Sequence, residues 1–144
     1  MSDQSPAEGP EAPARSDGAP ELTTKVSPRS VPDTVARLRS LAEANGMKVF
    51  AVIDHSGEAR RAGLELRDTN VVIFGSPQAG TPVMAANPLA ALDLPLKVLV
   101  WSDEGQVKLT YTAPATLANR YGLSQELAAR LAGIDVLTDH VVDG

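Results

Sequence analysis

Residues 96–111, LKVLVWSDEGQVKLTY, decide the fold class of this chain. Two apolar segments, 96–101 and 106–111, flank the acidic and glycine-containing turn 103–105. A turn this short joins strands that run antiparallel. Within 106–111 apolar and polar residues alternate strictly, which indicates a strand with one face toward a core and the other toward water. The stretch therefore predicts a β-hairpin in an antiparallel sheet.

Two further strands are expected upstream of this hairpin, at Lys48–Ile53 (KVFAVI) and Asn70–Phe74 (NVVIF). Both are short, rich in β-branched residues and bounded by turn residues. Unlike 106–111, they are apolar at consecutive positions, so we expect these two central strands to be covered on both faces. Helices would cover one face. The segment Gln78–Pro95, a partner subunit or a bound apolar ligand would cover the other.

The strongest helix signal follows a weaker candidate strand at Leu22–Val26. Ser30 offers an N-cap, Pro32 fits the first turn, and apolar residues then recur at steps of three or four until Asn45-Gly46. Weaker signals predict the remaining elements: a turn at 57–62, a short helix at Pro82–Asn87, helices at 113–121 and 124–132, and a helical or frayed segment at 134–142. The expected fold is α+β, with an antiparallel sheet of four to five strands and helices mainly on one face.

The first 20 residues differ from the rest in composition. They are rich in proline and acidic residues and, after the initiator, hold no aliphatic residue larger than alanine. Such a segment cannot bury enough apolar surface to fold, so we expect a disordered tail at 1–20 and a single domain at 21–144. The tail is either a plain solvated extension or an arm that docks a partner.

Overall charge and residue usage exclude several classes of function. The formal net charge is −5 and the basic residues are scattered, which disfavours binding to nucleic acid. The chain has no cysteine, so disulfides and thiolate chemistry are excluded. No basic stretch leads into an apolar run at the start, so we expect no membrane association and a cytoplasmic location.

Several motifs, taken together, resemble the family called domain of unknown function 302, or DUF302. The resemblance covers roughly residues 22–123 and rests on segments that occur in the family's order and spacing: Ile53-Asp54-His55, Ala59, Ala62-Gly63-Leu64, Val72 to Pro77, Thr81 to Met84, and Leu92 to Lys97. Ser76 departs from the family pattern, which has Asn at this place. The resemblance implies an antiparallel sheet backed by helices, as in the TATA-binding-protein-like folds, and a dimer. It implies no activity and no catalytic residues.

Asp54 and His55 are the only adjacent carboxylate and imidazole that directly follow a predicted buried strand. They follow a predicted strand, where a fold can hold an acid and base pair or a metal ligand. Alternatively, Asp54 caps the following turn and His55 bonds to the backbone. The other histidine, His140, is distant in the chain and no metal-ligand spacing occurs, so no metal site and no cofactor is expected.

Three other places are candidate ligand contacts. Phe74, Gly75 and Ser76 lie at a strand end where the long segment 78–95 leaves, although ordinary turn chemistry explains them too. Asp93 lies between two leucines and must be satisfied or exposed, by a backbone cap, an ion pair or a ligand. Trp101 is suited either to an interface or to stacking against a ligand.

The sequence thus supports two hypotheses of different classes. In the first, the chain is a cytoplasmic homodimeric binding domain whose apolar sheet face forms a subunit interface or holds a small apolar or amphipathic molecule. In the second, it is an enzyme that uses His55 as acid or base with Asp54 orienting the imidazole.

Overall fold

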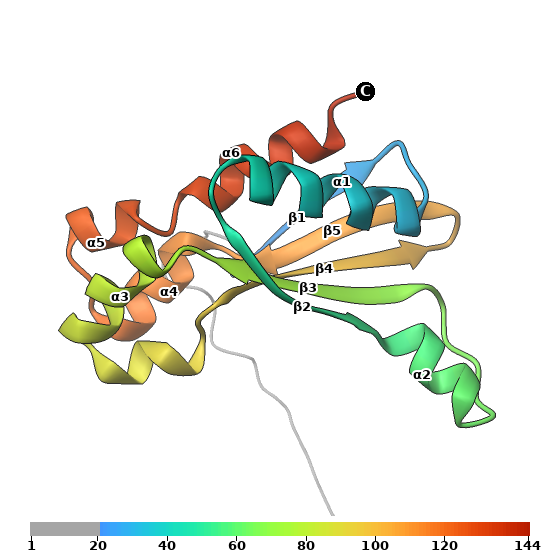
Figure 1. Ribbon diagram of the computed structural model, residues 1–144, viewed down its shortest axis with the longest axis horizontal. Coiled ribbons are helices and arrows are strands. Elements are labelled where there is room, and N and C mark those ends of the chain that lie inside the picture. The colour runs from blue at the N-terminus through green and yellow to red at the C-terminus, as the bar shows by residue number, and fades with distance from the viewer. Residues whose placement is uncertain (1–20) are drawn as a thin grey trace, which may run out of the picture.

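The computed structural model describes residues 21–144 as one antiparallel sheet with helices (Figure 1). The predicted tail, 1–20, lies outside the described residues. The strands follow one another across the sheet in the order β1-β5-β4-β3-β2. Their bounds are β1 Leu22–Ser27, β2 Lys48–Asp54, β3 Thr69–Gly75, β4 Leu96–Asp103 and β5 Gln106–Thr112. The predicted α+β fold with an antiparallel sheet is confirmed.

The hairpin that decides the fold class forms as its sequence indicates. Leu99 pairs with Thr110 in the β4–β5 register. The two turn residues Glu104 and Gly105 both have positive φ, 50° and 90°, as a tight two-residue hairpin turn requires. Alternation in β5 places Leu109 in the core, while Thr110 points to the opposite face.

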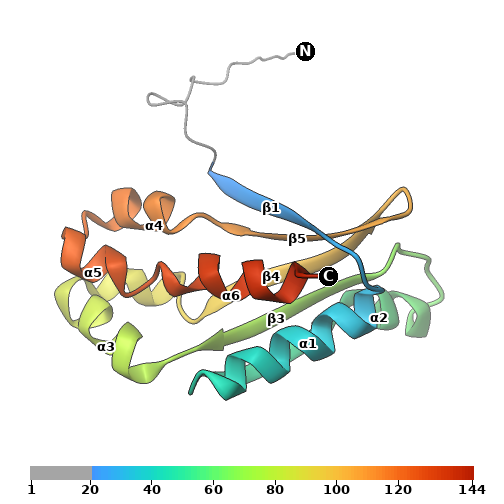
Figure 2. The ribbon, with the colours of Figure 1, turned by 90° about the horizontal axis from the view of Figure 1, so that it is seen from above.

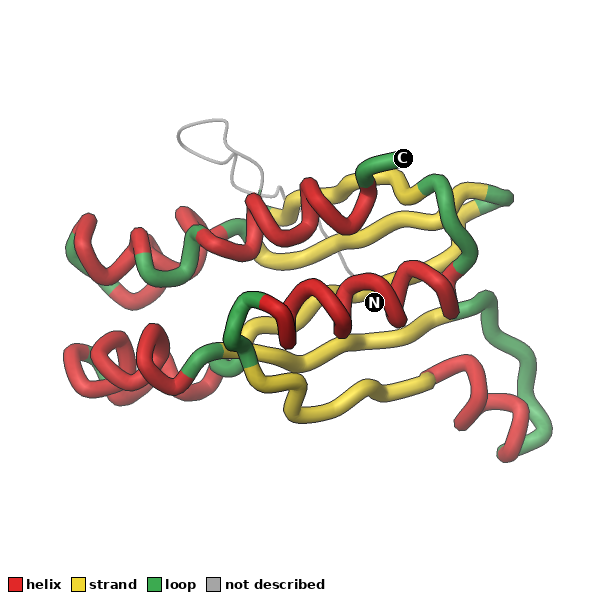
Figure 3. Tube along the Cα trace, turned by 45° about the horizontal axis from the view of Figure 1, so that its top comes forward, coloured by secondary structure: helices red, strands yellow, loops and turns green. Residues whose placement is uncertain are grey.

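Helices α1 (Val31–Ala44) and α6 (Gly133–Val142) lie side by side over one face of the sheet (Figures 2 and 3). The predicted cap of α1 is present, because the Ser30 side chain accepts a hydrogen bond from the Asp33 backbone N–H at 3.2 Å. Between these helices and the sheet lies the main core, which includes Leu38, Val72, Phe74, Val98, Val100, Leu109, Ile134 and Val141.

Helix α6 is a full member of this layer rather than a frayed end, because side chains from the first strand and from α1 hold it. Lys25 donates from Nζ to the Asp135 carbonyl at 2.8 Å and to Thr138 Oγ1 at 2.7 Å. Arg29 and Arg37 both donate to the Val141 carbonyl, at 2.8 and 3.1 Å. Cationic groups at a helix C-terminus satisfy carbonyls that lack partners within the helix and oppose its negative dipole end.

The remaining helices lie beyond the two ends of the sheet (Figure 1). One end carries α2 (His55–Arg61). The other carries α3 (Pro77–Ala86), the 3₁₀ helix η2 (Pro88–Leu92), α4 (Pro114–Tyr121) and α5 (Gln125–Ala129). A second hydrophobic cluster joins this group through Val83, Ala90, Leu117 and Leu131.

The prediction that segment 78–95 could cover the second face of the sheet is wrong. The segment 78–95 packs with α4 and α5 beyond the sheet end and does not roof the face opposite α1 and α6. Strand β2 is an edge strand, not a central one. Phe50 and Ile53 are 46% and 38% exposed, so no element within residues 21–144 covers them fully. We call the sheet face opposite α1 and α6 the open face.

Candidate functional site

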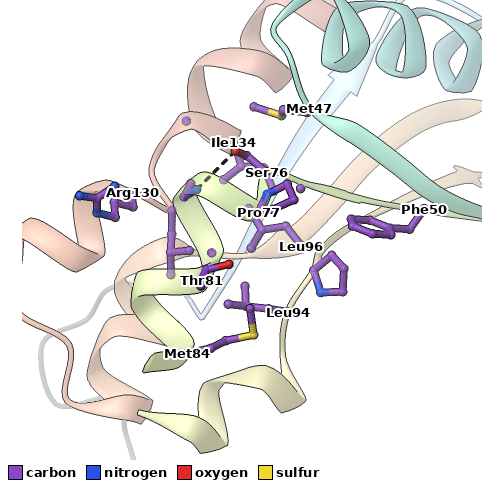
Figure 4. Close-up of a pocket in the computed structure, with 16 residues that line it drawn as sticks. Met47, Phe50, Ser76, Pro77, Thr81, Met84, Leu94, Leu96, Arg130 and Ile134 are labelled. Carbon is purple, nitrogen blue, oxygen red and sulfur yellow. Dashed lines mark hydrogen bonds between the residues drawn. The ribbon is translucent and has the colours of Figure 1, made fainter. Parts of the chain in front are cut away.

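A cavity of about 270 Å³ lies at the sheet end where β2 begins and β3 ends (Figure 4). Its walls come from three parts of the chain: helix α3, the ends of the neighbouring strands, and the connection between α5 and α6. The labelled side chains that surround it are mostly apolar, among them Met47, Phe50, Pro77, Met84, Leu94, Leu96 and Ile134. We call this cavity the end pocket.

Helix α3 forms one wall of the end pocket. Its start is fixed by Ser76, whose Oγ accepts a hydrogen bond from the Ala79 backbone N–H at 3.3 Å. Pro77 occupies the first turn, where its missing N–H has no cost. Gly80 and Met84 follow at helical spacing, so the three residues share one face of the helix, and all three line the pocket. The sequence predicts a helix only over Pro82–Asn87, whereas α3 begins at Pro77, so its pocket-lining face was not predicted.

Phe50 forms the opposite wall and owes its position to a bulge in β2. The β2–β3 register shifts between Val49 and Ala51, so Phe50 has no opposite partner on β3. A bulge of this kind redirects a side chain at the edge of a sheet. The aliphatic chain of Lys48 carries its ammonium group to 5.1 Å from the Phe50 ring centre. The ring thus stands at the meeting point of the end pocket and the open face.

Few polar groups reach the end pocket. The Ser76 hydroxyl is engaged as the α3 cap. Thr81 lines the pocket, and its hydroxyl has no hydrogen-bond partner among residues 21–144. Arg130 is drawn at the edge of the group, apart from Phe50 and Met84 (Figure 4). An apolar cavity lined by one unbonded hydroxyl, that of the exposed Thr81, and with one cation at its rim is suited to a small, mostly apolar molecule.

Only some of the residues that the sequence suggested as ligand contacts line the end pocket. Gly75 and Ser76 line the end pocket. Phe74 does not, because β-strand alternation turns its side chain into the main core, where it is fully buried. Trp101 lies on the open face and donates from Nε1 to Thr110 Oγ1 at 3.0 Å.

Asp93 is satisfied by an ion pair and lies outside the end pocket. Arg120 approaches its Oδ2 at 2.8 Å, and the Tyr121 hydroxyl donates to the same oxygen. The Tyr121 hydrogen bond, followed by that from Arg120, lowers the pKa of Asp93 below its ordinary value. Asp93 therefore ties the end of η2 to α4, which supports the structural interpretation of this carboxylate.

Asp54 caps α2, which was the structural alternative for this residue. Its Oδ1 accepts from the Gly57 backbone N–H and from Ser56 Oγ, both at 2.9 Å. The hydrogen bond from Gly57 and then that from Ser56 lower its pKa. His55 begins α2 at the surface, and its imidazole has no hydrogen-bond partner among residues 21–144. Asp54, at the end of β2, and Asp93, just before β4, lie at opposite ends of the sheet.

Comparisons with known proteins cover most of the chain. A family model described as "Domain of unknown function DUF302" matches residues 22–136. A crystal structure of an uncharacterized conserved DUF302 protein from Bacillus stearothermophilus superposes with a TM-score of 0.74 at 21% identity, covering 87% of this chain and 98% of that one. This likeness supports the fold alone.

Curated relatives are found in Brucella. Proteins named fluoride-specific ion channel FluC 1 from Brucella suis biovar 1 and Brucella abortus biovar 1 are each 41% identical over 124 residues. The matches cover 83% of this chain but only 49% and 46% of those proteins, so the chain spans about half the length of the curated relatives it matches. Across residues 21–144, no helix has the length and apolar character needed to cross a bilayer.

Proposed function

We propose that this chain, which belongs to the DUF302 family, is a binding domain that holds a small apolar or amphipathic molecule in the end pocket. The observation that carries this proposal is the cavity of about 270 Å³ between Phe50 and α3, with apolar walls and a single free hydroxyl. Small-molecule sites typically combine an apolar concavity with few polar groups that fix orientation.

The chain provides its own reporters for a test of this proposal. Two of its three methionines, Met47 and Met84, line the end pocket. We expect ¹³C-methyl spectra of the full-length protein to show both signals shifting when small apolar alcohols and ring compounds of about ten non-hydrogen atoms are added. Compounds of this size bind with Kd values of roughly 10 μM to 1 mM. The methyl signal of Leu99, on the open face, serves as the reference.

A blocking variant makes the test specific to the pocket. A Cβ atom at Gly80 would lie 3.8 Å from Met84 Cε and 3.9 Å from Leu94 Cδ1, so a side chain there enters the cavity without an initial clash. Gly80→Leu should abolish the titration. Ala85→Leu places the same side chain on an exposed position of the same helix and should leave it intact. Titration unaffected by Gly80→Leu, or no response of either methionine to any compound, would disprove the proposal.

Three further points, concerning ion conduction, location and the Asp54-His55 pair, are not part of the proposed binding function. Ion conduction is stated by the name of the Brucella proteins, and we do not extend it to a chain that matches about half of their length. We retain the cytoplasmic location as a prediction from the sequence. We give no catalytic role to Asp54 and His55, because the Asp54 carboxylate accepts hydrogen bonds from Ser56 and Gly57.

We also propose that the open face pairs with a second copy of the chain. A face of five strands of about seven residues measures roughly 24 by 23 Å in projection. This projected area of about 550 Å² is of the same order as the roughly 800 Å² per partner of a standard interface. Val71, Ile73 and Leu99 form its apolar centre, with the exposed Phe50 and Ile53 beside them.

Charge at the two ends of the open face fits this self-pairing. Lys48 and Lys97 lie at one strand end and form no salt bridge among residues 21–144. The turn residue Glu104 lies at the other end, next to Asp103, which pairs with Lys108 and Arg67 of its own chain. A twofold axis parallel to the two stacked sheets and perpendicular to their strands would place Lys48 and Lys97 of each copy opposite the Glu104 end of its partner.

The test of this pairing is the mass in solution. We expect light scattering to give a dimer for the natural chain and for Val136→Glu, which alters an exposed apolar residue on α6. Ile53→Glu places a charge on the open face and should give a monomer. A natural chain that is monomeric at about 100 μM, or an Ile53→Glu variant that stays dimeric, would contradict the pairing.

A further inference from the structure

The residues that line the end pocket indicate the chemical class of its ligand. This inference rests on the proposed function. The planar Phe50 ring and the saturated rings of Pro77 and Pro95 line a cavity that also contacts the thioether side chains of Met47 and Met84. Figure 4 shows Phe50 and Met84 on separate sides of the group. Thioether sulfur and aromatic edges both interact favourably with an aromatic ring, beyond the effect of buried area.

The size of the cavity sets the number of rings. An engineered apolar cavity of about 150 Å³ accommodates benzene. The end pocket, at about 270 Å³, is nearly twice as large. It therefore matches a molecule of two fused rings and does not suit a long acyl chain, which would extend out of the cavity.

The charge of the ligand follows from the polar groups. Thr81 brings a hydroxyl without a partner to the cavity, whereas the cationic Arg130 lies at the edge. An ionised group buried against apolar walls without a charged partner is strongly disfavoured. One hydroxyl or carbonyl substituent, placed against Thr81, is satisfied at little cost.

We infer that the end pocket is selective for a neutral, planar, two-ring aromatic molecule with one hydrogen-bonding substituent. Its rings lie against Phe50 and the Met84 sulfur, and its substituent bonds to the Thr81 hydroxyl. The chemistry of the walls, rather than buried area alone, gives this selectivity.

Three probes separate the contribution of the aromatic rings from that of the hydroxyl substituent. They are 2-naphthol, its saturated analogue decahydro-2-naphthol, and naphthalene. The saturated analogue has the same skeleton and substituent but no aromatic ring, and it is the more hydrophobic of the two alcohols. Burial alone would therefore favour it. Favourable contacts of the aromatic rings with Phe50 and the methionine sulfur predict the opposite order of affinity. We expect 2-naphthol to bind about three- to tenfold more tightly than decahydro-2-naphthol when binding is followed by the Met47 methyl signal.

Two variants assign the preference to named side chains. Met84→Leu keeps an apolar side chain of similar volume but removes the sulfur, and should reduce the preference for 2-naphthol over the saturated alcohol by about threefold. Thr81→Val removes the hydroxyl at an exposed position and should weaken 2-naphthol about fivefold while leaving naphthalene unchanged.

The outcomes distinguish this inference from the function on which it rests. Equal or tighter binding of decahydro-2-naphthol, blocked by Gly80→Leu, would overturn the aromatic assignment and leave the pocket as a binding site. A preference for 2-naphthol that is unchanged in both Met84→Leu and Thr81→Val would overturn the roles given to these side chains. Absence of any shift at Met47 with all three probes would overturn the inference, and the broader panel of small apolar alcohols and ring compounds then decides the proposed function.

Discussion

Replacement of Gly80 by alanine should raise stability and weaken ligand binding at the same time. Gly80 lies within α3, where alanine is favoured over glycine by about 0.5–1 kcal/mol. The added methyl group would meet Met84 Cε at 3.8 Å and Leu94 Cδ1 at 3.9 Å, which is ordinary van der Waals contact. Partial burial of one methyl adds roughly 0.5 kcal/mol. The free energy of unfolding should therefore rise by about 1–1.5 kcal/mol.

Thermal unfolding followed by circular dichroism measures the first effect, with an expected rise in Tm of about 3–8 °C for a chain of this length. The second effect has the opposite sign. A methyl group, comparable in volume to the roughly 30 Å³ of a water molecule, removes about a tenth of the cavity. A Tm that falls in Gly80→Ala, or ligand binding that tightens, would refute the placement of this residue on the pocket wall.

Two other predictions concern the polar contacts that hold helices to the sheet. The pKa of Asp93 is lowered, first by the Tyr121 hydroxyl and then by Arg120, so the ionised carboxylate stabilises the fold above the ordinary aspartate pKa. This stabilisation is lost as the pH falls through the lowered pKa. Tyr121→Phe should thus reduce the unfolding free energy in urea more at pH 7 than at pH 3, and an equal loss at both pH values would contradict this linkage. Thr138→Val removes a buried acceptor of Lys25 Nζ and should cost about 1–3 kcal/mol in the same assay, whereas a neutral result would show that Lys25 does not depend on this bond.

The sequence was sufficient to predict the helix ends and turns that depend on residues close together in the chain. Ser30 caps α1 with its own hydroxyl, and Gly46 follows its end with a φ of 78°. Glu104-Gly105 fix the hairpin through their positive φ values. Each of these features depends on residues a few positions apart, so the printed sequence predicts it directly.

The end pocket could not be predicted from the sequence in this way. Gly80 and Pro82 both lie inside α3, and each lowers the expectation of a helix, which hid the start at Ser76 and the pocket-facing side. The bulge that redirects Phe50 depends on pairing with β3 and leaves no local mark. Consecutive apolar residues in β2 and β3 correctly indicated a second apolar face but could not show that 78–95 packs on α4 instead.

The most direct test of the account is a set of intermolecular nuclear Overhauser effects between the tightest-binding probe and the methyl groups of the full-length protein. Binding in the end pocket predicts contacts from the probe to the Met47 and Met84 methyl groups and none to Leu99 on the open face. Contacts to Leu99 and Ile73, with none to either methionine, would place the molecule on the sheet face and contradict the account.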